Sequence, residues 1–255
     1  MHDTGTGGVV LFLHAFTLDA SQWDHQVAAL SGDMRCVRVD FWGCGTSPPP
    51  PAGEPSLEGF ATSVIAALDA RHIDRVAVVG LSMGGYLAFA MWRLAPERIR
   101  ALVLCNTRAT ADAEGPRNDR LVMAERVERE RSVESIVEPM VARMLSPGAQ
   151  TEAHIVDPVR GRIRRCTPAG IAFAQRAMAA RPDSTGLLAS IDVPALVIAG
   201  TQDAIVATPE VRAISGGIPR ARSVDLDCGH LSNLERPSAF NRHLTEFLAP
   251  ARMSS

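Results

Sequence analysis

The chain has 255 residues, of which 46% are hydrophobic, with a formal net charge of −2 and a mean hydropathy of +0.05. A chain of this length and composition can bury a sizeable core, and it contains no run of about 18 uncharged apolar residues that would cross a membrane. The near-zero charge provides no long-range field for phosphate backbones or anionic lipids, so neither nucleic acid nor a membrane is expected as a partner.

Short apolar runs alternate with longer amphipathic stretches along the chain. The runs have strand length and are bounded by Gly, Asp or Asn, whereas the amphipathic stretches have helical spacing. Several of the runs are apolar throughout, which is typical of a parallel sheet covered by helices on both faces. In chain order we expect strands over 9–13, 36–39, 76–79, 101–104, 195–198 and 221–226, and helices over 20–30, 56–71, 84–94, 208–215 and 237–248.

The alternation stops over residues 107–190, where no stretch has a strand pattern. Residues 133–145 and 171–178 have helical spacing instead, and Pro139 is expected to kink or restart the first of these helices. The segment therefore has the pattern of a helical insertion. The predicted organisation is one α/β core, formed by residues 1–106 and 191–255, with a helical cap inserted over 107–190.

The cysteines and the first residues bear on the cellular compartment. The five cysteines are scattered, odd in number and without zinc-site spacing, which favours reduced, buried thiols over disulfides. The stretch from Met1 to Gly8 has neither the basic nor the apolar segment of an export signal. These features indicate a cytoplasmic protein. The cysteines are Cys36, Cys44, Cys105, Cys166 and Cys228.

A single serine is surrounded by glycines in Gly80-Leu-Ser-Met-Gly84. This G-x-S-x-G sequence lies between a predicted strand and a predicted helix, which is the context that the motif requires. Side chains at positions 80 and 84 would collide in so sharp a turn, and Ser82 is forced into a strained conformation with its oxygen outward. The following helix directs its free N–H groups and positive dipole end at that oxygen. Ser82 is therefore a candidate nucleophile.

An acid and a histidine follow two later strands. Asp203 lies in the loop after the predicted strand at 195–198, and His230 lies in the loop after the strand at 221–226. Because the carboxyl ends of parallel strands share one edge of the sheet, we expect Ser82, Asp203 and His230 to gather at that edge.

Over nearly its whole length the chain resembles the α/β-hydrolase superfamily. Besides the G-x-S-x-G turn at residues 80–84, which we call the elbow, the resemblance lies in Asp40-Phe-Trp-Gly-Cys-Gly-Thr-Ser47, in Ala95-Pro-Glu-Arg98 and in Gly229-His-Leu-Ser-Asn-Leu-Glu-Arg-Pro237. Within the superfamily, Leu104-Cys-Asn-Thr107 and the elbow look most similar to the 3-oxoadipate enol-lactonases, with carboxylesterases and cofactor-free haloperoxidases as neighbours. The resemblance implies an α/β-hydrolase fold, with a mostly parallel sheet, helices on both faces and an inserted helical cap.

The resemblance also implies roles for individual residues. Ser82 is the nucleophile, His230 the base and Asp203 the group that orients it, while the backbone N–H groups of Phe16 and Met83 form the oxyanion hole. These roles suit the residue types, because a serine hydroxyl needs a base to attack at neutral pH. We therefore expect a serine hydrolase that cleaves a small, largely apolar ester or lactone through an acyl-enzyme. No cofactor and no metal are expected, and a homo-oligomer is left open.

The sequence departs from the family pattern at a few positions. Ala15 stands where the family usually has Gly, which adds a methyl group to the predicted oxyanion loop. Trp42 and Cys44 replace Arg and His at the predicted pocket rim. The chain also begins near the point where the second strand of the family ends, so the opening hairpin of the sheet is expected to be absent or shortened.

Other functions remain open at this point. One is a non-catalytic or repurposed hydrolase fold that binds or isomerises a small ligand, and another is a C–C bond hydrolase or cofactor-free perhydrolase with the same triad. A pure binding module has no need of Ser82, Asp203 and His230 together, which favours the hydrolase. His14 is a second candidate base, but its position at a strand end favours a structural hydrogen-bonding role.

Overall fold

A computed structural model describes residues 1–249. Within these residues, seven strands form one sheet in the order β1-β3-β2-β4-β5-β6-β7. β1 pairs antiparallel with β3, and all other neighbouring strands pair in parallel. The mostly parallel sheet predicted from the sequence is thus confirmed. The strands are β1 (His2–Thr4), β2 (Gly8–Leu13), β3 (Met34–Val39), β4 (Val76–Leu81), β5 (Ile99–Cys105), β6 (Ala195–Gly200) and β7 (Ala221–Leu226).

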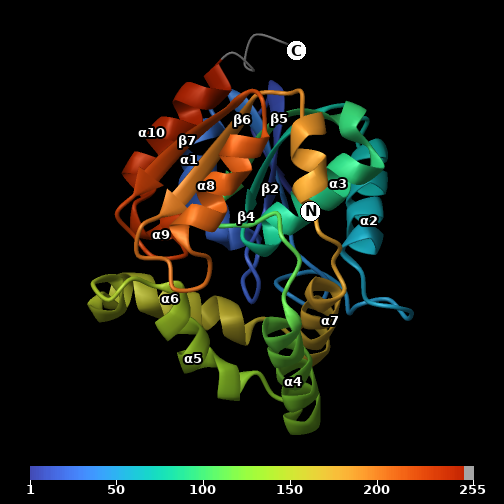
Figure 1. Cartoon of the computed structure of the whole chain (residues 1–255), viewed down its shortest axis with the longest axis vertical. Helices are drawn as coiled ribbons and strands as arrows, with labels where there is room; N and C mark the ends of the chain where they lie inside the picture. The colour runs from blue at the N-terminus through green and yellow to red at the C-terminus, as the bar shows by residue number, and fades with distance from the viewer. Residues whose placement is uncertain (250–255) are drawn as a thin grey trace.

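Helices cover both faces of the sheet. Figure 1 shows α1 and α10 to the left of the sheet and α2 and α3 to its right, and each of these pairs packs together. The α-helices are α1 (Asp24–Leu30), α2 (Leu57–Asp69), α3 (Met83–Leu94), α4 (Glu114–Glu130), α5 (Glu134–Met144), α6 (Ala153–Arg164), α7 (Pro168–Ala179), α8 (Thr208–Gly217), α9 (Ser232–Glu235) and α10 (Pro237–Leu248). Short 3-10 helices are η1 (Ala20–Trp23), η2 (Pro96–Arg98), η3 (Ala149–Thr151) and η4 (Thr185–Ser190).

The apolar strands lie in the middle of the core. β4 and β6 are buried along their whole length, which explains their continuous apolar sequences. Trp23 joins the sheet to the helical layer, because its ring centroid lies 5.2 Å from that of Phe12 in β2 and 6.1 Å from that of Phe240 in α10. Each of these buried side chains stabilises the fold by about 2 kcal/mol through removal of apolar surface from water.

Some elements differ from the sequence-based expectation. The polar strand β1 and the charged helix α6 have patterns that predict neither a strand nor a helix, and both were missed. Of the two outcomes expected at Pro139, a kink or a restart, the restart is wrong, since α5 runs through Pro139 as one helix. Pro139 and Ser135 are exposed, so water can bond the Ser135 carbonyl that the missing proline N–H leaves free.

Helices α4, α5, α6 and α7 lie between β5 and β6 in sequence and gather at one end of the sheet in Figure 1. We call residues 107–190 the helical segment. Its two ends are joined through the fully buried carboxylate of Asp112, which pairs with Arg108 at 2.9 Å, Arg120 at 2.6 Å and Arg181 at 2.7 Å. Burial opposes the charge of Asp112, but the hydrogen bonds from Arg181 and Arg120 outweigh it and hold its pKa well below the ordinary value.

One prediction about the cysteines is wrong. Cys44, in the loop after β3, and Cys166, between α6 and α7, form a disulfide, whereas Cys36, Cys105 and Cys228 are free and buried. The two bonded residues are 122 positions apart, so only the tertiary structure brings them together. The inference of a cytoplasmic location loses the support that it took from reduced thiols. None of the helices within residues 1–249 is long and apolar enough to span a membrane.

Candidate active site

The structure places Ser82 at a sharp turn between β4 and α3. Its φ of 57° and ψ of −113° lie in a region that side-chain-bearing residues rarely adopt. The Ser82 N–H donates to the Cys105 carbonyl at 2.9 Å, and the Thr107 hydroxyl donates to the Ser82 carbonyl at 2.9 Å. These contacts from the end of β5 fix the strained backbone. The residue is only 8% exposed.

The glycines of this turn are explained by what surrounds them. A Cβ atom on Gly80 would overlap the Gly84 carbonyl, and one on Gly84 would overlap the Leu13 carbonyl at the end of β2. The turn is therefore packed directly against the strand that leads into the His14-Ala15-Phe16 loop. The steric reason given for G-x-S-x-G from the sequence agrees with this packing.

Asp203 and His230 meet as expected at the carboxyl edge of the sheet. His230 Nδ1 lies 2.8 Å from Asp203 Oδ2. The other oxygen of Asp203 accepts hydrogen bonds from the backbone N–H groups of Ile205 at 2.8 Å and Val206 at 3.0 Å. Burial alone would raise the pKa of Asp203, but the charge of His230 and the hydrogen bonds from His230, Asn106 and the Val206 N–H outweigh it, so the pKa lies below the ordinary value. Asp203 is thereby kept ionised.

The candidate nucleophile Ser82 and His230 are not in hydrogen-bond contact. Within residues 1–249, no hydrogen bond joins Ser82 Oγ to His230, although the bond from His230 Nδ1 to Asp203 leaves Nε2 as the nitrogen for the serine. Such contacts are often long without a substrate and tighten when it binds. His230 is almost fully buried, and its backbone N–H donates to the Met144 carbonyl of α5 at 2.9 Å.

The two backbone donors expected in the oxyanion hole are available. No intramolecular acceptor within the described chain takes a hydrogen bond from the N–H of Phe16 or of Met83. Met83 is the first residue of α3, where helix N–H groups have no partner in the helix. The loop and the turn adjoin, because Leu13, His14, Met83 and Gly84 line one cavity. The arrangement provides donors for a developing anion.

Sequence reasoning missed a residue that supports Asp203. Asn106 follows β5 and is fully buried, with a φ of 48°. Its Nδ2 donates to Asp203 Oδ2 at 2.9 Å, and its Oδ1 accepts from the Ser232 hydroxyl at 2.6 Å. The signal was present as an asparagine at the carboxyl end of a predicted strand, next to Thr107. Only the fold shows which acid it faces.

A buried glutamate joins the histidine loop to the helical segment, and it too was missed. Glu235 accepts from the N–H of Gly229 at 3.1 Å and from the hydroxyl of Ser146 at 2.6 Å. Together with the bond between His230 and Met144, these contacts hold the loop of the histidine against the end of α5. The position of His230 therefore depends on the helical segment.

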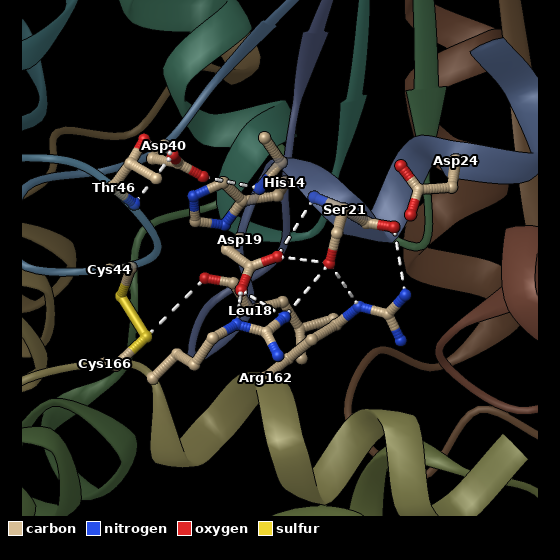
Figure 2. Close-up of polar contacts among 12 residues, drawn as sticks. His14, Leu18, Asp19, Ser21, Asp24, Asp40, Cys44, Thr46, Arg162 and Cys166 are labelled. Carbon is tan, nitrogen blue, oxygen red and sulfur yellow. Dashed lines mark hydrogen bonds and ion pairs between the residues drawn. A yellow bond between two sulfur atoms is a disulfide. The ribbon is translucent and has the colours of Figure 1, made fainter. Parts of the chain in front are cut away.

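On the side of the oxyanion loop, a second set of contacts joins the helical segment to the core (Figure 2). The disulfide lies in this seam, and Cys166 Sγ is 3.6 Å from the Leu18 carbonyl. Four more pairs cross it, at 2.6 to 3.1 Å: Arg165 with Asp19, Arg165 with Ser21, Arg162 with Ser21, and Thr167 N–H with the Gly43 carbonyl. Residues 18–21, which follow Phe16, are thus held by the helical segment.

Aromatic side chains line the region beside the turn. The ring centroids of Phe41 and Phe60 are 4.2 Å apart, and those of Trp42 and Phe173 are 5.4 Å apart. Phe41 and Phe60 also line the cavity that contains Met83. These side chains give an apolar surface to the cavity beside Met83, the residue that follows Ser82. No cluster of three or more His, Cys, Asp or Glu side chains in the described part of the chain has a metal-binding arrangement.

Comparisons with known proteins agree with this geometry. The chain is 28% identical over 233 residues to 3-oxoadipate enol-lactonase 2 of Acinetobacter baylyi, covering 91% of this chain and 85% of the relative. Its structure is similar to a thermophilic esterase from Thermogutta terrifontis with malate bound, at 34% identity and a TM-score of 0.94, covering 99% of this chain and 93% of the esterase. It is also similar to the enol-lactonase from Burkholderia xenovorans, at 29% identity and a TM-score of 0.89, covering 97% and 95% of the two chains.

The resemblance drawn from the sequence motifs is therefore confirmed, as is the α/β-hydrolase fold. The model of the alpha/beta hydrolase family matches residues 10–243, which include both the sheet and the helical segment. By this match, the chain belongs to the alpha/beta hydrolase family, and it is a hydrolase with esterases and lactonases among its relatives.

Proposed function

We propose that the protein is a serine hydrolase that cleaves a small, largely apolar carboxylic ester or lactone through an acyl-enzyme on Ser82. The observation that carries the proposal is the combination of a strained serine at the turn between β4 and α3 with the hydrogen-bonded pair of His230 and Asp203 at the same edge of the sheet. The esterase and enol-lactonase relatives support this substrate class.

In the proposed reaction, Ser82 Oγ attacks the carbonyl carbon while His230 Nε2 accepts its proton. Asp203 holds the imidazole in the Nδ1–H tautomer and stabilises the imidazolium. The N–H groups of Phe16 and Met83 bind the oxyanion, and His230 then returns the proton to the leaving oxygen. Water attacks the acyl-enzyme by the same route in reverse. A lactone differs only in that its leaving group stays attached to the acyl chain.

The proposal of an apolar substrate rests on the surroundings of the turn. Phe41 and Phe60 line a cavity together with Met83 and Gly84 of the turn, and Trp42 and Phe173, which belongs to α7, pack against these two rings. We propose that residues 107–190 act as a cap that covers this apolar surface and excludes water from the acyl group. Contacts from the cap to both the histidine loop and the oxyanion side support this role.

Turnover of 4-nitrophenyl acetate, butyrate and octanoate, together with a panel of lactones, tests the proposal. Wild-type protein should release 4-nitrophenolate in a saturable reaction, and Ser82→Ala should lower kcat by at least about a thousandfold. Asp33→Asn is the control variant, because Asp33 is exposed and directly precedes β3, at the amino end of a parallel strand rather than at the carboxyl edge that carries the site. This variant should leave kcat unaltered. If wild type and Ser82→Ala behave alike, the serine-hydrolase proposal fails and a non-catalytic binding role gains support.

A further inference from the structure

The loop that carries the Phe16 N–H is held by buried side chains. His14 Nε2 accepts a hydrogen bond from the Phe41 N–H at 2.8 Å, which requires that nitrogen to be unprotonated. The proton of the neutral ring therefore lies on Nδ1, and Nδ1 donates to the Ala15 carbonyl at 2.7 Å. Burial lowers the pKa of His14, which keeps the ring neutral. Both nitrogens are occupied, so His14 is unable to act as a base.

The bond to the Ala15 carbonyl has a consequence for the next N–H. No peptide bond in the described chain is cis, so the carbonyl of Ala15 and the N–H of Phe16 point in opposite directions across one planar group. A side chain that fixes the direction of the carbonyl thereby fixes the direction of the N–H. The Leu18 N–H adds a second, longer bond of 3.2 Å to the same carbonyl.

The other side of Ala15 is held as well. The Ala15 N–H donates to Oε1 of the buried Gln22 at 2.8 Å, and Gln22 Nε2 donates to Asn233 Oδ1 at 3.2 Å. Asn233 lies three residues after His230. The Thr17 hydroxyl donates to the Phe16 carbonyl at 2.6 Å. The peptide groups on both sides of Phe16 are thus fixed, while the Phe16 N–H has no intramolecular acceptor within residues 1–249 and is left for a ligand.

We propose that His14 is a positioning residue for the oxyanion hole: its Nδ1–H holds the Ala15 carbonyl so that the Phe16 N–H is directed at the carbonyl oxygen of the substrate. This inference rests on the proposed function, since it assigns a reaction step to Phe16. It goes beyond a structural role for His14, because it requires the loss of one particular hydrogen bond to lower the rate of the chemical step.

Two substitutions of similar size separate the two bonds of His14. In His14→Asn, the amide nitrogen lies near the position of Nδ1 and can still donate to the Ala15 carbonyl, whereas the Phe41 N–H loses its acceptor. In His14→Gln, the amide oxygen lies near the position of Nε2 and can accept from Phe41, whereas the Ala15 carbonyl loses its donor. A role limited to stability predicts that kcat follows the loss in Tm in both variants.

Steady-state kinetics on 4-nitrophenyl butyrate should distinguish the variants. For His14→Gln we expect kcat to fall by about tenfold to a hundredfold with KM changed by less than about threefold, because the donor acts mainly in the transition state. For His14→Asn we expect kcat within about fivefold of wild type, even if its Tm is the lower of the two. Equal loss of kcat in both variants, or an unchanged kcat in His14→Gln, would overturn the proposal.

A measurement on wild-type protein keeps the proposal testable should either variant fail to fold. Nitrogen NMR of histidine-labelled protein should show His14 as the Nδ1–H tautomer at pH 7, and the opposite tautomer would overturn the proposal. The outcome is distinct from failure of the proposed function, which appears as equal activity of wild type and Ser82→Ala on the same substrate.

Discussion

The disulfide between Cys44 and Cys166 should make a large contribution to stability. A link between residues 122 positions apart removes about 16 cal/mol/K of chain entropy from the unfolded state, or about 5 kcal/mol at 25 °C. Removal of a native disulfide from a small protein typically lowers the free energy of unfolding by about 2 to 5 kcal/mol. We therefore expect Cys44→Ser, Cys166→Ser and the double variant to lose between about 2 and 5 kcal/mol of unfolding free energy.

Urea unfolding with and without dithiothreitol measures this contribution. Reductant should lower the unfolding free energy of wild type to about the level of the double variant, while leaving the double variant unchanged. Cys36→Ser is the matched control, because Cys36 is buried and free, and its sensitivity to reductant should equal that of wild type. Thiol titration of denatured wild type should find three free thiols rather than five. Five free thiols in protein purified without reductant, or an effect of reductant below about 1 kcal/mol, would refute the reasoning.

The remaining predictions concern acid stability and the oxyanion loop. Burial disfavours the charge of Asp40, but hydrogen bonds from Ala20, His2 and Thr46 lower its pKa to about 2. Figure 2 shows Asp40 beside Thr46. Because the folded pKa is depressed below the ordinary value, Asp40 contributes about 2 kcal/mol above pH 5, and this contribution is lost as the pH falls toward 2. The difference in unfolding free energy between wild type and Asp40→Asn should accordingly shrink by about half between pH 7 and pH 3, and a constant difference would contradict it. Since hydrogen bonds hold both peptide groups of Ala15, Ala15→Gly should leave kcat unchanged or lower it less than tenfold, and a tenfold increase would show that the methyl group strains the hole.

The core of the fold follows from local sequence patterns. Each predicted strand is present, with bounds that differ by no more than two residues, because apolar runs between Gly, Asp and Asn report burial in a parallel sheet directly. The three-residue strand β1 escapes this reasoning, since its residues are polar and exposed at the sheet edge. Helix α6 contains Pro158 and Gly161 among charged residues, and its formation depends on packing against α5.

Candidate site residues could be found from the sequence where a motif or a strand end marks them. Ser82, Asp203 and His230 each follow a predicted strand, and the structure places them at the same edge of the sheet. The residues that support the candidate triad could not be found in this way, because their partners are distant in sequence. Asn106 contacts Asp203 from 97 positions away, and Glu235 contacts Ser146 from 89 positions away.

Mass spectrometry after reaction with a phosphonofluoridate tests the central claim most directly. The reagent bonds to a serine oxygen with loss of fluoride, and only a hydroxyl activated by a base beside an oxyanion hole reacts rapidly. The account predicts one adduct per chain on the peptide that contains Ser82, complete loss of ester hydrolysis when labelling is complete, and no adduct in Ser82→Ala. A label on another residue would contradict the account. So would protein that remains unlabelled and keeps its full ester-hydrolysing activity after prolonged treatment with the reagent.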